Sequence, residues 1–130
     1  MTGAETKAFA LDGTYVRLSD GADAIPIPVG ADFWERIGER AELQGGRLLM
    51  LFHVTKRNLH WEMHPAGDEI LCLISGAMSV VLDEGKARQR KVRLKPGEAF
   101  IVPRGVWHTF EIEQDGDLLA ITRGAGTEHR

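Results

Sequence analysis

Two stretches of this sequence decide the fold: residues 59–76, LHWEMHPAGDEILCLISG, and residues 97–108, GEAFIVPRGVWH. In both, short apolar runs are bounded by glycine or proline, the residues that mark turns. Further runs of the same kind lie on either side of them. Short strands at roughly 8–12-residue spacing with Gly/Pro turns are typical of a β-sandwich or barrel. The sequence therefore predicts an all-β fold.

Working outward from these stretches, the pattern of apolar runs and turns predicts the strands. They are expected at residues 14–18, 47–55, 59–64, 69–75, 77–83, 89–94, 100–102, 107–113 and 117–123. Residues 25–28 contain Pro26 and Pro28, which lack a backbone donor, so this segment is expected to be extended or at a sheet edge. The turn at residues 65–68 suggests that the strands on either side could pair as a hairpin, which would bring Glu69 back beside His64.

One helix is expected, at residues 31–44. Asp32 could cap it, and Phe33, Ile37 and Ala41 fall on one face at a spacing of four residues. Gly38 weakens this helix. The fold class predicted from the residues is thus an all-β domain with one short N-terminal helix.

Length and composition favour one domain. The chain has 130 residues, of which 43% are hydrophobic, enough for a core. We expect a single domain over residues 1–130, in which residues 1–13 are loosely held and residues 58–123 form the motif core. The 15 glycines are spread along the chain, as turns would be.

Composition also excludes several classes of protein. No apolar run approaches the ~20 residues of a membrane span, so no membrane partner is expected, and no signal peptide is visible. The single cysteine, Cys72, excludes a disulfide framework and a cysteine-built zinc site, and a cytoplasmic location is the expectation. The net charge of −3 argues against a nucleic-acid partner, so the six basic residues within residues 86–95 are expected to form a solvated hairpin.

The histidines and glutamates around residues 60–69 carry the chemistry. His60, Glu62 and His64 alternate along one predicted strand, so their side chains point to the same sheet face. His108 opens a later strand whose alternate residues are apolar, which indicates that His108 points inward. A buried carboxylate such as Glu69 needs a partner or a metal, and imidazole with carboxylate suits a divalent Mn, Fe, Ni, Co or Zn ion. A metal-free, hydrogen-bonded pair of His64 and Glu69 is the alternative.

These residues resemble the two conserved motifs of the cupin superfamily. His64-x4-Glu69-x6-Gly76 is similar to the second half of the first motif, and Gly97-x5-Pro103-x-Gly105-x2-His108 is similar to the second motif. The short stretch between the motifs is typical of small single-domain bacterial cupins. The resemblance implies a double-stranded β-helix, or jelly-roll, barrel.

The resemblance also implies a ligand set for a divalent transition metal: Glu62, His64, Glu69 and His108. The last three carry over position by position, whereas Glu62 stands where the family usually has the first histidine of His-x-His. His60 shares the face of Glu62 and could replace it as a ligand. Glu62 or His60 could instead be a general base.

Two functions are compatible with these motifs. The first is a metal-dependent enzyme of the isomerase or dioxygenase type that acts on a small molecule. The second is a non-catalytic barrel, metal-bound or metal-free, that binds or senses a small-molecule ligand. A homodimer is expected in either case, because the outward apolar residues Ile70, Cys72 and Ile74 need cover.

Overall fold

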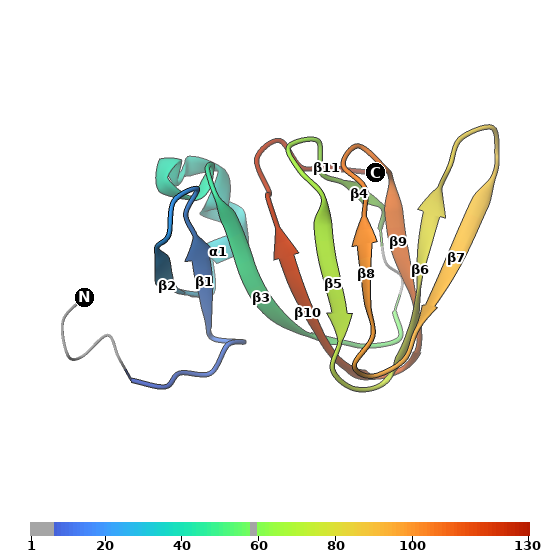
Figure 1. Cartoon of the computed structure of the whole chain (residues 1–130), viewed down its shortest axis with the longest axis horizontal. Helices are drawn as coiled ribbons and strands as arrows, with labels where there is room; N and C mark the ends of the chain where they lie inside the picture. The colour runs from blue at the N-terminus through green and yellow to red at the C-terminus, as the bar shows by residue number, and fades with distance from the viewer. Residues whose placement is uncertain (1–6, 58–59) are drawn as a thin grey trace.

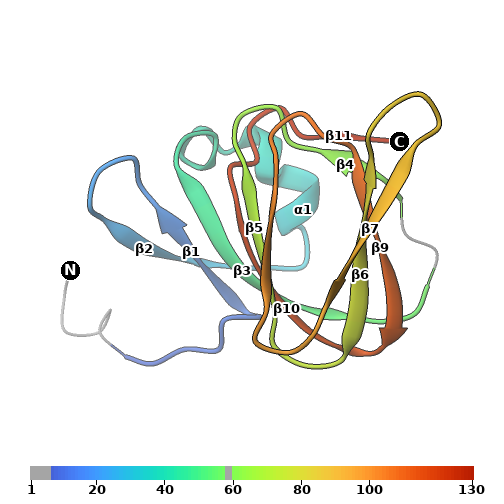
Figure 2. The same cartoon turned by 45° about the vertical axis from the view of Figure 1, so that its right-hand side comes forward.

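The protein is described by a computed structural model that covers residues 7–57 and 60–130. Its strands form two antiparallel sheets that face each other (Figures 1 and 2). The six-stranded sheet has the order β2 (Ala24–Pro28), β1 (Thr14–Leu18), β3 (Arg47–Val54), β10 (Gly116–Thr122), β5 (Glu69–Leu73), β8 (Ala99–Val102). The five-stranded sheet has the order β11 (Glu128–His129), β4 (Glu62–Met63), β9 (His108–Gln114), β6 (Ala77–Asp83), β7 (Gln89–Leu94). The all-β prediction is confirmed, and the two sheets do not close into one continuous barrel.

The core lies between the two sheets, and strands such as β5 and β10 turn alternate residues toward it. Leu71 and Leu73 on β5 are each 1% exposed, and they belong to the same core cluster as Met78 and Val80 on β6. Since β5 and β6 lie in different sheets, this cluster joins the two layers.

In the N-terminal part, the strands agree with the sequence-based prediction and the helix does not. β2 is an edge strand, as its two prolines predict. The predicted helix at residues 31–44 is wrong in length. The chain forms one turn of α-helix, α1 (Phe33–Arg36), followed by two 3-10 turns at Ile37–Glu39 and Ala41–Leu43. Gly38 within this segment disfavours a continuous helix.

Aromatic packing fixes the short helix to the six-stranded sheet. The ring of Phe33 meets Tyr15 of β1 edge to face at 5.5 Å, and Trp34 lies 6.0 Å from Phe52 of β3. Phe33 is 4% exposed and belongs to the core. The helix therefore covers the inner face of β1 and β3. No helix among the described residues is long and apolar enough to cross a membrane.

The turns after β5 and β9 pack directly against each other. Gly76 has a φ of +90°, and a Cβ atom there would lie 2.7 Å from the carbonyl oxygen of Gln114. A Cβ atom at Gly116 would lie 2.0 Å from the carbonyl oxygen of Ser75. Only glycine permits this approach of two backbones.

Candidate metal centre

A cavity of about 680 Å³ lies between the sheets. Its volume falls within the range of small-molecule pockets, roughly 300–1,000 Å³. Apolar side chains provide much of its wall, among them Trp34, Leu48, Met50, Phe52, Phe110 and Leu118. Polar groups also line it, and they include His60, Glu62, His64 and Glu69, which the sequence singled out.

The structure brings Glu62, His64, Glu69 and His108 together, the first three lining this cavity and His108 buried beside them, and we call these four residues the deep cluster. One ligand atom from each lies within 4.8 Å of the others. Glu62 lies on β4, His64 follows that strand, Glu69 begins β5 and His108 begins β9. His108 is 0% exposed, as its apolar neighbours predict, and Glu69 is 4% exposed.

Glu69 lies beside His64, as the sequence predicts, but the hairpin proposed to bring it there is wrong. β4 pairs with β9 and β11, whereas β5 pairs with β10 and β8 in the other sheet. Residues 65–68 therefore carry the chain from one sheet to the other. His64 Nε2 and Glu69 Oε2 face each other across the interior at 3.3 Å.

Three atoms of the deep cluster are buried without a hydrogen-bond partner: Nε2 of His64, Nε2 of His108 and Oε1 of Glu69. His108 Nε2 lies 3.1 Å from Glu69 Oε1, close enough for an ion pair but without hydrogen-bond geometry. Buried polar atoms normally have partners, because leaving one unpaired costs ~1–3 kcal/mol. Three such atoms facing one another indicate a site for a cation.

Neighbouring groups fix the orientation of both imidazole rings, with a proton on Nδ1. His108 Nδ1 lies 3.1 Å from the carbonyl oxygen of Val106, which can only accept, so Nδ1 carries the proton. His64 Nδ1 lies 2.8 Å from the Thr127 hydroxyl, which itself donates to the carbonyl of Gly124. The hydroxyl therefore accepts from His64. In both rings Nε2 therefore faces the deep cluster, where its lone pair would be available to a metal ion, as in metal-bound histidines.

Electrostatics keep Glu69 ionised. Burial alone would raise its pKa, but His108, His64 and the Thr122 hydroxyl outweigh burial and lower the pKa to about 2. Burial likewise tends to lower the pKa of His108, and the contact with Glu69 outweighs it, so the pKa is raised. Thr122 donates its hydroxyl hydrogen to Glu69 Oε2, which leaves Oε1 as the unpaired oxygen.

The spacing of the donor atoms suits one ion. Ligand atoms at 2.0–2.2 Å from a tetrahedral or octahedral ion lie roughly 3.0–3.5 Å apart. Glu69 Oε1 lies 3.1 Å from His108 Nε2, and Glu69 Oε2 lies 3.3 Å from His64 Nε2. Glu62 Oε1 lies 3.8 Å from His64 Nε2 and 3.9 Å from His108 Nε2. The geometry fits a divalent ion, with Glu62 as the most distant donor. The role of these four residues as metal ligands stays a prediction.

His60 lines the same cavity and lies outside the deep cluster. It forms a second group of potential ligands with Glu62 and His129, again within 4.8 Å of one another. Sequence reasoning gave no reason to place His129 here, because β11 is a strand of only two residues that it did not predict. Leu59, the first residue of the predicted strand at 59–64, lies outside the described residues.

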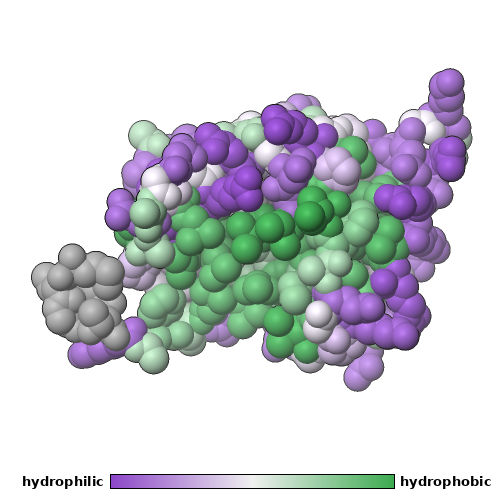
Figure 3. All heavy atoms as spheres, in the orientation of Figure 1, coloured by the Kyte–Doolittle hydropathy of each residue, from purple (hydrophilic) through white to green (hydrophobic). Residues whose placement is uncertain are grey.

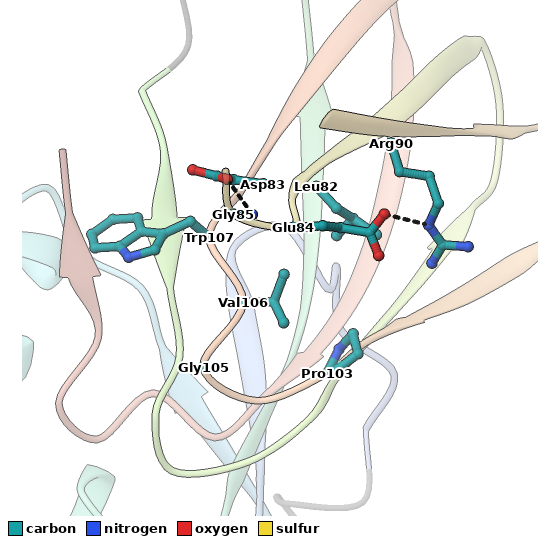
Figure 4. A pocket seen from close by; sticks show the side chains of 9 residues that line it. All are labelled: Leu82, Asp83, Glu84, Gly85, Arg90, Pro103, Gly105, Val106 and Trp107. Carbon is teal, nitrogen blue, oxygen red and sulfur yellow. Dashed lines mark hydrogen bonds and ion pairs between the residues drawn. The ribbon is translucent and has the colours of Figure 1, made fainter. Parts of the chain in front are cut away.

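A smaller hollow of about 430 Å³ lies on the five-stranded sheet, between the β6–β7 turn and the β8–β9 loop (Figure 4). Its carboxylates already have partners. Asp83 accepts a hydrogen bond from the backbone of Gly85, and Glu84 lies 3.6 Å from Arg90. No histidine lines it. This side hollow is therefore a weaker candidate for a metal site than the cavity.

Several solved structures are similar to this chain. They include the Fe(II) form of HppE with the alternative substrate (S)-1-HPP (20% identity, TM-score 0.51, 58% of this chain and 42% of that chain). A protein from Neisseria meningitidis matches at 24% identity and a TM-score of 0.50, over 58% of this chain and 72% of that chain. A cupin-2 domain protein from Shewanella frigidimarina has 20% identity and a TM-score of 0.49, over 58% of this chain and 68% of that chain.

These identities show a shared fold and nothing more, and the aligned part is less than half of HppE. A comparison with curated protein sequences found no match. The family model described as the cupin domain matches residues 49–123, which is more than half of the chain and includes the whole deep cluster. The chain therefore belongs to the cupin family.

Proposed function

We propose that this protein is a small metal-dependent enzyme that binds one divalent transition-metal ion at Glu62, His64, Glu69 and His108. The observation that carries the proposal is the set of three buried, unpartnered atoms that face one another in the cavity. Two carboxylates offset the charge of a divalent ion, and two imidazoles favour Mn, Fe, Co, Ni or Zn. The similar HppE structures include iron and cobalt forms, which supports this choice for the fold.

A metal ion bound in this way would supply a Lewis acid that polarises an oxygen of the bound substrate. The protein residues would supply position and proton transfer. Glu69 and the two histidines are almost fully buried, so they would hold the ion. Glu62 has 28% of its side chain exposed, so it could instead take a proton from the substrate, as could His60. An isomerase or a dioxygenase reaction would suit this arrangement.

The cavity also indicates the kind of substrate. The apolar wall formed by Trp34, Met50 and Phe52 would bind a hydrocarbon or aromatic part. Arg57 and His60, both exposed and both lining the cavity, would favour an anionic group at its polar side. We propose a small molecule that combines both parts, bound within a double-stranded β-helix formed by a single domain of residues 1–130. The one free cysteine supports a cytoplasmic location.

A non-catalytic ligand-binding barrel is the second candidate. The observation that favours it is the gathering of the described buried histidines and carboxylates at the deep cluster. If Glu62 binds the ion, the described part of the chain keeps no buried histidine or carboxylate free to act as a separate base. Turnover would then depend on exposed residues that line the cavity, such as His60.

Elemental analysis of protein purified without added metal tests metal binding. We expect about one equivalent of a transition metal in the wild type and its loss in His64→Ala. His53→Ala is the matched control, because His53 is exposed and pairs with Asp117 outside the deep cluster. Less than about a tenth of an equivalent in the wild type, with no gain on reconstitution, would refute the proposal.

We also propose a homodimer formed through the outward face of the six-stranded sheet. Leu49, Ile121, Ile70 and Ile101 are successive register partners across β3, β10, β5 and β8. The neighbouring outward row contains Leu51, Leu119, Cys72 and Ala99. Figure 3 shows the resulting apolar patch over these strands, and we call it the outer sheet face.

A second copy of this chain is the proposed occupant, because two continuous apolar sheet faces of this kind can cover each other. Ile101 is 57% exposed, which is unusual for isoleucine on a monomer surface. Ile101→Glu should convert a dimer to a monomer in sedimentation analysis. Ile25→Glu, at a 40% exposed position on β2, should leave the dimer intact. A monomeric wild type would contradict this proposal.

A further inference from the structure

The carboxylate of Glu62 faces two different groups of histidines with its two oxygen atoms. Oε1 lies 3.8 Å from His64 Nε2 and 3.9 Å from His108 Nε2, within the deep cluster. Oε2 lies 3.8 Å from His129 Nδ1. The register of the five-stranded sheet explains this position, because Glu62 pairs with His108 on one side and with His129 on the other.

His60, Glu62 and His129 form a compact set of donors, and we call these three residues the outer triad. One ligand atom from each lies within 4.8 Å of the others, and the rings of His60 and His129 are 5.0 Å apart. All three residues line the cavity. Two imidazoles and one carboxylate are the three-ligand set of many zinc sites in which a further position stays open.

Arg130, the residue after His129, holds the outer triad in place. Arg130 exchanges two backbone hydrogen bonds of 3.0 Å with Trp61, which fixes β11 beside β4. Its guanidinium lies over Trp107 at 4.5 Å and over Trp61 at 5.5 Å, and it also pairs with Asp83. His129 is thus anchored next to Glu62 before any ligand binds, which reduces the entropic cost of binding.

Charge favours a cation at this place. The ion-pair partners of Glu62 in the described part of the chain are His64, His108 and His129, with no lysine or arginine among them. We propose that His60, His129 and Oε2 of Glu62 form a second divalent-cation site, so that Glu62 bridges this site and the deep cluster. The bridge rests on the metal site proposed above, whereas the outer triad offers three ligands by itself.

The two sites should differ in affinity. Two divalent ions that share one carboxylate repel each other, and the outer triad is more exposed to water than the deep cluster. The outer ion should therefore bind second and exchange faster. Because the outer triad lines the cavity, an ion there would also contact a bound substrate, as in two-metal sites where both ions hold one substrate.

The test is a calorimetric Zn²⁺ titration of the metal-stripped wild type and four variants, with equivalents checked by elemental analysis. The wild type should bind two equivalents, the second at least tenfold more weakly. His129→Ala and His60→Ala should each lose the weaker equivalent and keep the tighter one. His64→Ala should lose the tighter equivalent, and His53→Ala should match the wild type. His60, His129 and His53 are exposed, so these variants should fold, which thermal unfolding would verify.

The outcomes separate the two proposals. One equivalent in the wild type, lost in His64→Ala and unchanged in His129→Ala and His60→Ala, would overturn the outer site and leave the deep one. One equivalent that survives His64→Ala but not His129→Ala would support the outer site and refute the deep one. Two equivalents that both survive His129→Ala and His60→Ala would also overturn the outer site.

Discussion

Two hollows of this molecule each contain two carboxylates, and they differ in how those carboxylates are paired. In the side hollow, Asp83 is paired with Arg130 and Glu84 with Arg90, and the backbone of Gly85 donates to Asp83. In the cavity, Glu62 and Glu69 face histidine nitrogens, and three buried atoms have no partner. The first arrangement is complete without a ligand. The second arrangement leaves buried donor atoms open to a cation, so the pairing of the acidic groups, and not their number, distinguishes the candidate site.

Removing a deep carboxylate should produce the largest effect. Glu69→Gln keeps the size of the side chain but removes the charge between His64 and His108. We expect metal affinity to fall more than about 100-fold, beyond the 10–100-fold typical of residues that only orient a ligand. Calorimetric titration with Zn²⁺ or Mn²⁺ measures this change.

Glu84→Gln is the matched control for that experiment, because it removes a carboxylate from the side hollow. Its metal affinity should equal that of the wild type. Equal losses of metal affinity in Glu69→Gln and Glu84→Gln would contradict the inference that only the unpaired carboxylates of the cavity bind a metal ion.

Removing a group that orients a histidine should produce an intermediate effect. Thr127→Val deletes the hydroxyl that accepts from His64 Nδ1, so the ring is free to turn its Nε2 away from the deep cluster. Metal affinity should fall by about 10–100-fold while one equivalent still binds. Thr14→Val on β1 is the control, and an unchanged affinity in Thr127→Val would show that the hydroxyl does not orient the ring.

Acid should destabilise the metal-free protein through Glu69. Its pKa is about 2 in the folded chain, below its usual 4.5, so its contribution to stability is present above pH 4.5. That contribution is lost as the pH falls from 4.5 to about 2. Urea unfolding of the metal-stripped wild type between pH 2 and 6 should follow this trend, and Glu69→Gln should lack this part of it. Identical pH profiles would contradict the assignment.

The contribution of His108 to the stability of the metal-free protein depends on pH in the opposite direction, and at higher pH. Its pKa is raised above the usual 6.5, so its contribution to the metal-free protein is present below pH 6.5 and is lost as the pH rises. A metal ion would displace the proton and reverse this trend. The same unfolding series, repeated with Zn²⁺ at pH 6–8, should therefore show stability that increases with pH.

The smallest effect is expected in the side hollow. Asp83→Asn keeps an oxygen that accepts from Gly85 and weakens only the pairing with Arg130. The midpoint of urea unfolding and the affinity of the tight metal site should stay close to wild type. A large drop in either quantity would show that Asp83 supports the fold or the tight metal site more than its pairing with Arg130 and Gly85 indicates.

The sequence predicted most strands well because each of them has its own local pattern. The exceptions are β4, which is shorter than the predicted strand, and β11, which was not predicted. Alternating burial along β5 and β10, and turns at Gly76 and Gly97, can be read within a few residues. The helix at residues 31–44 was overestimated because apolar spacing at Phe33, Ile37 and Ala41 does not register how strongly Gly38 disfavours the helix.

The candidate site was only partly predictable, because its assembly depends on contacts distant in sequence. Parity along one strand indicated a shared face for Glu62 and His64, and the inward placement of His108 followed from its apolar neighbours. The four-residue link at 65–68 suits a hairpin and a crossing between sheets equally well, so the pairing of β4 was misread. His129 was not placed because a two-residue strand with charged neighbours has no periodic signal.

The hydrogen bond between His64 and Thr127 has a consequence for biosynthesis. Thr127, and Gly124 to which its hydroxyl donates, are translated after every residue of the deep cluster. Until this segment leaves the ribosome and docks beside β4, the imidazole of His64 has no acceptor to set its orientation. The arrangement of the deep cluster would thus be completed late in synthesis.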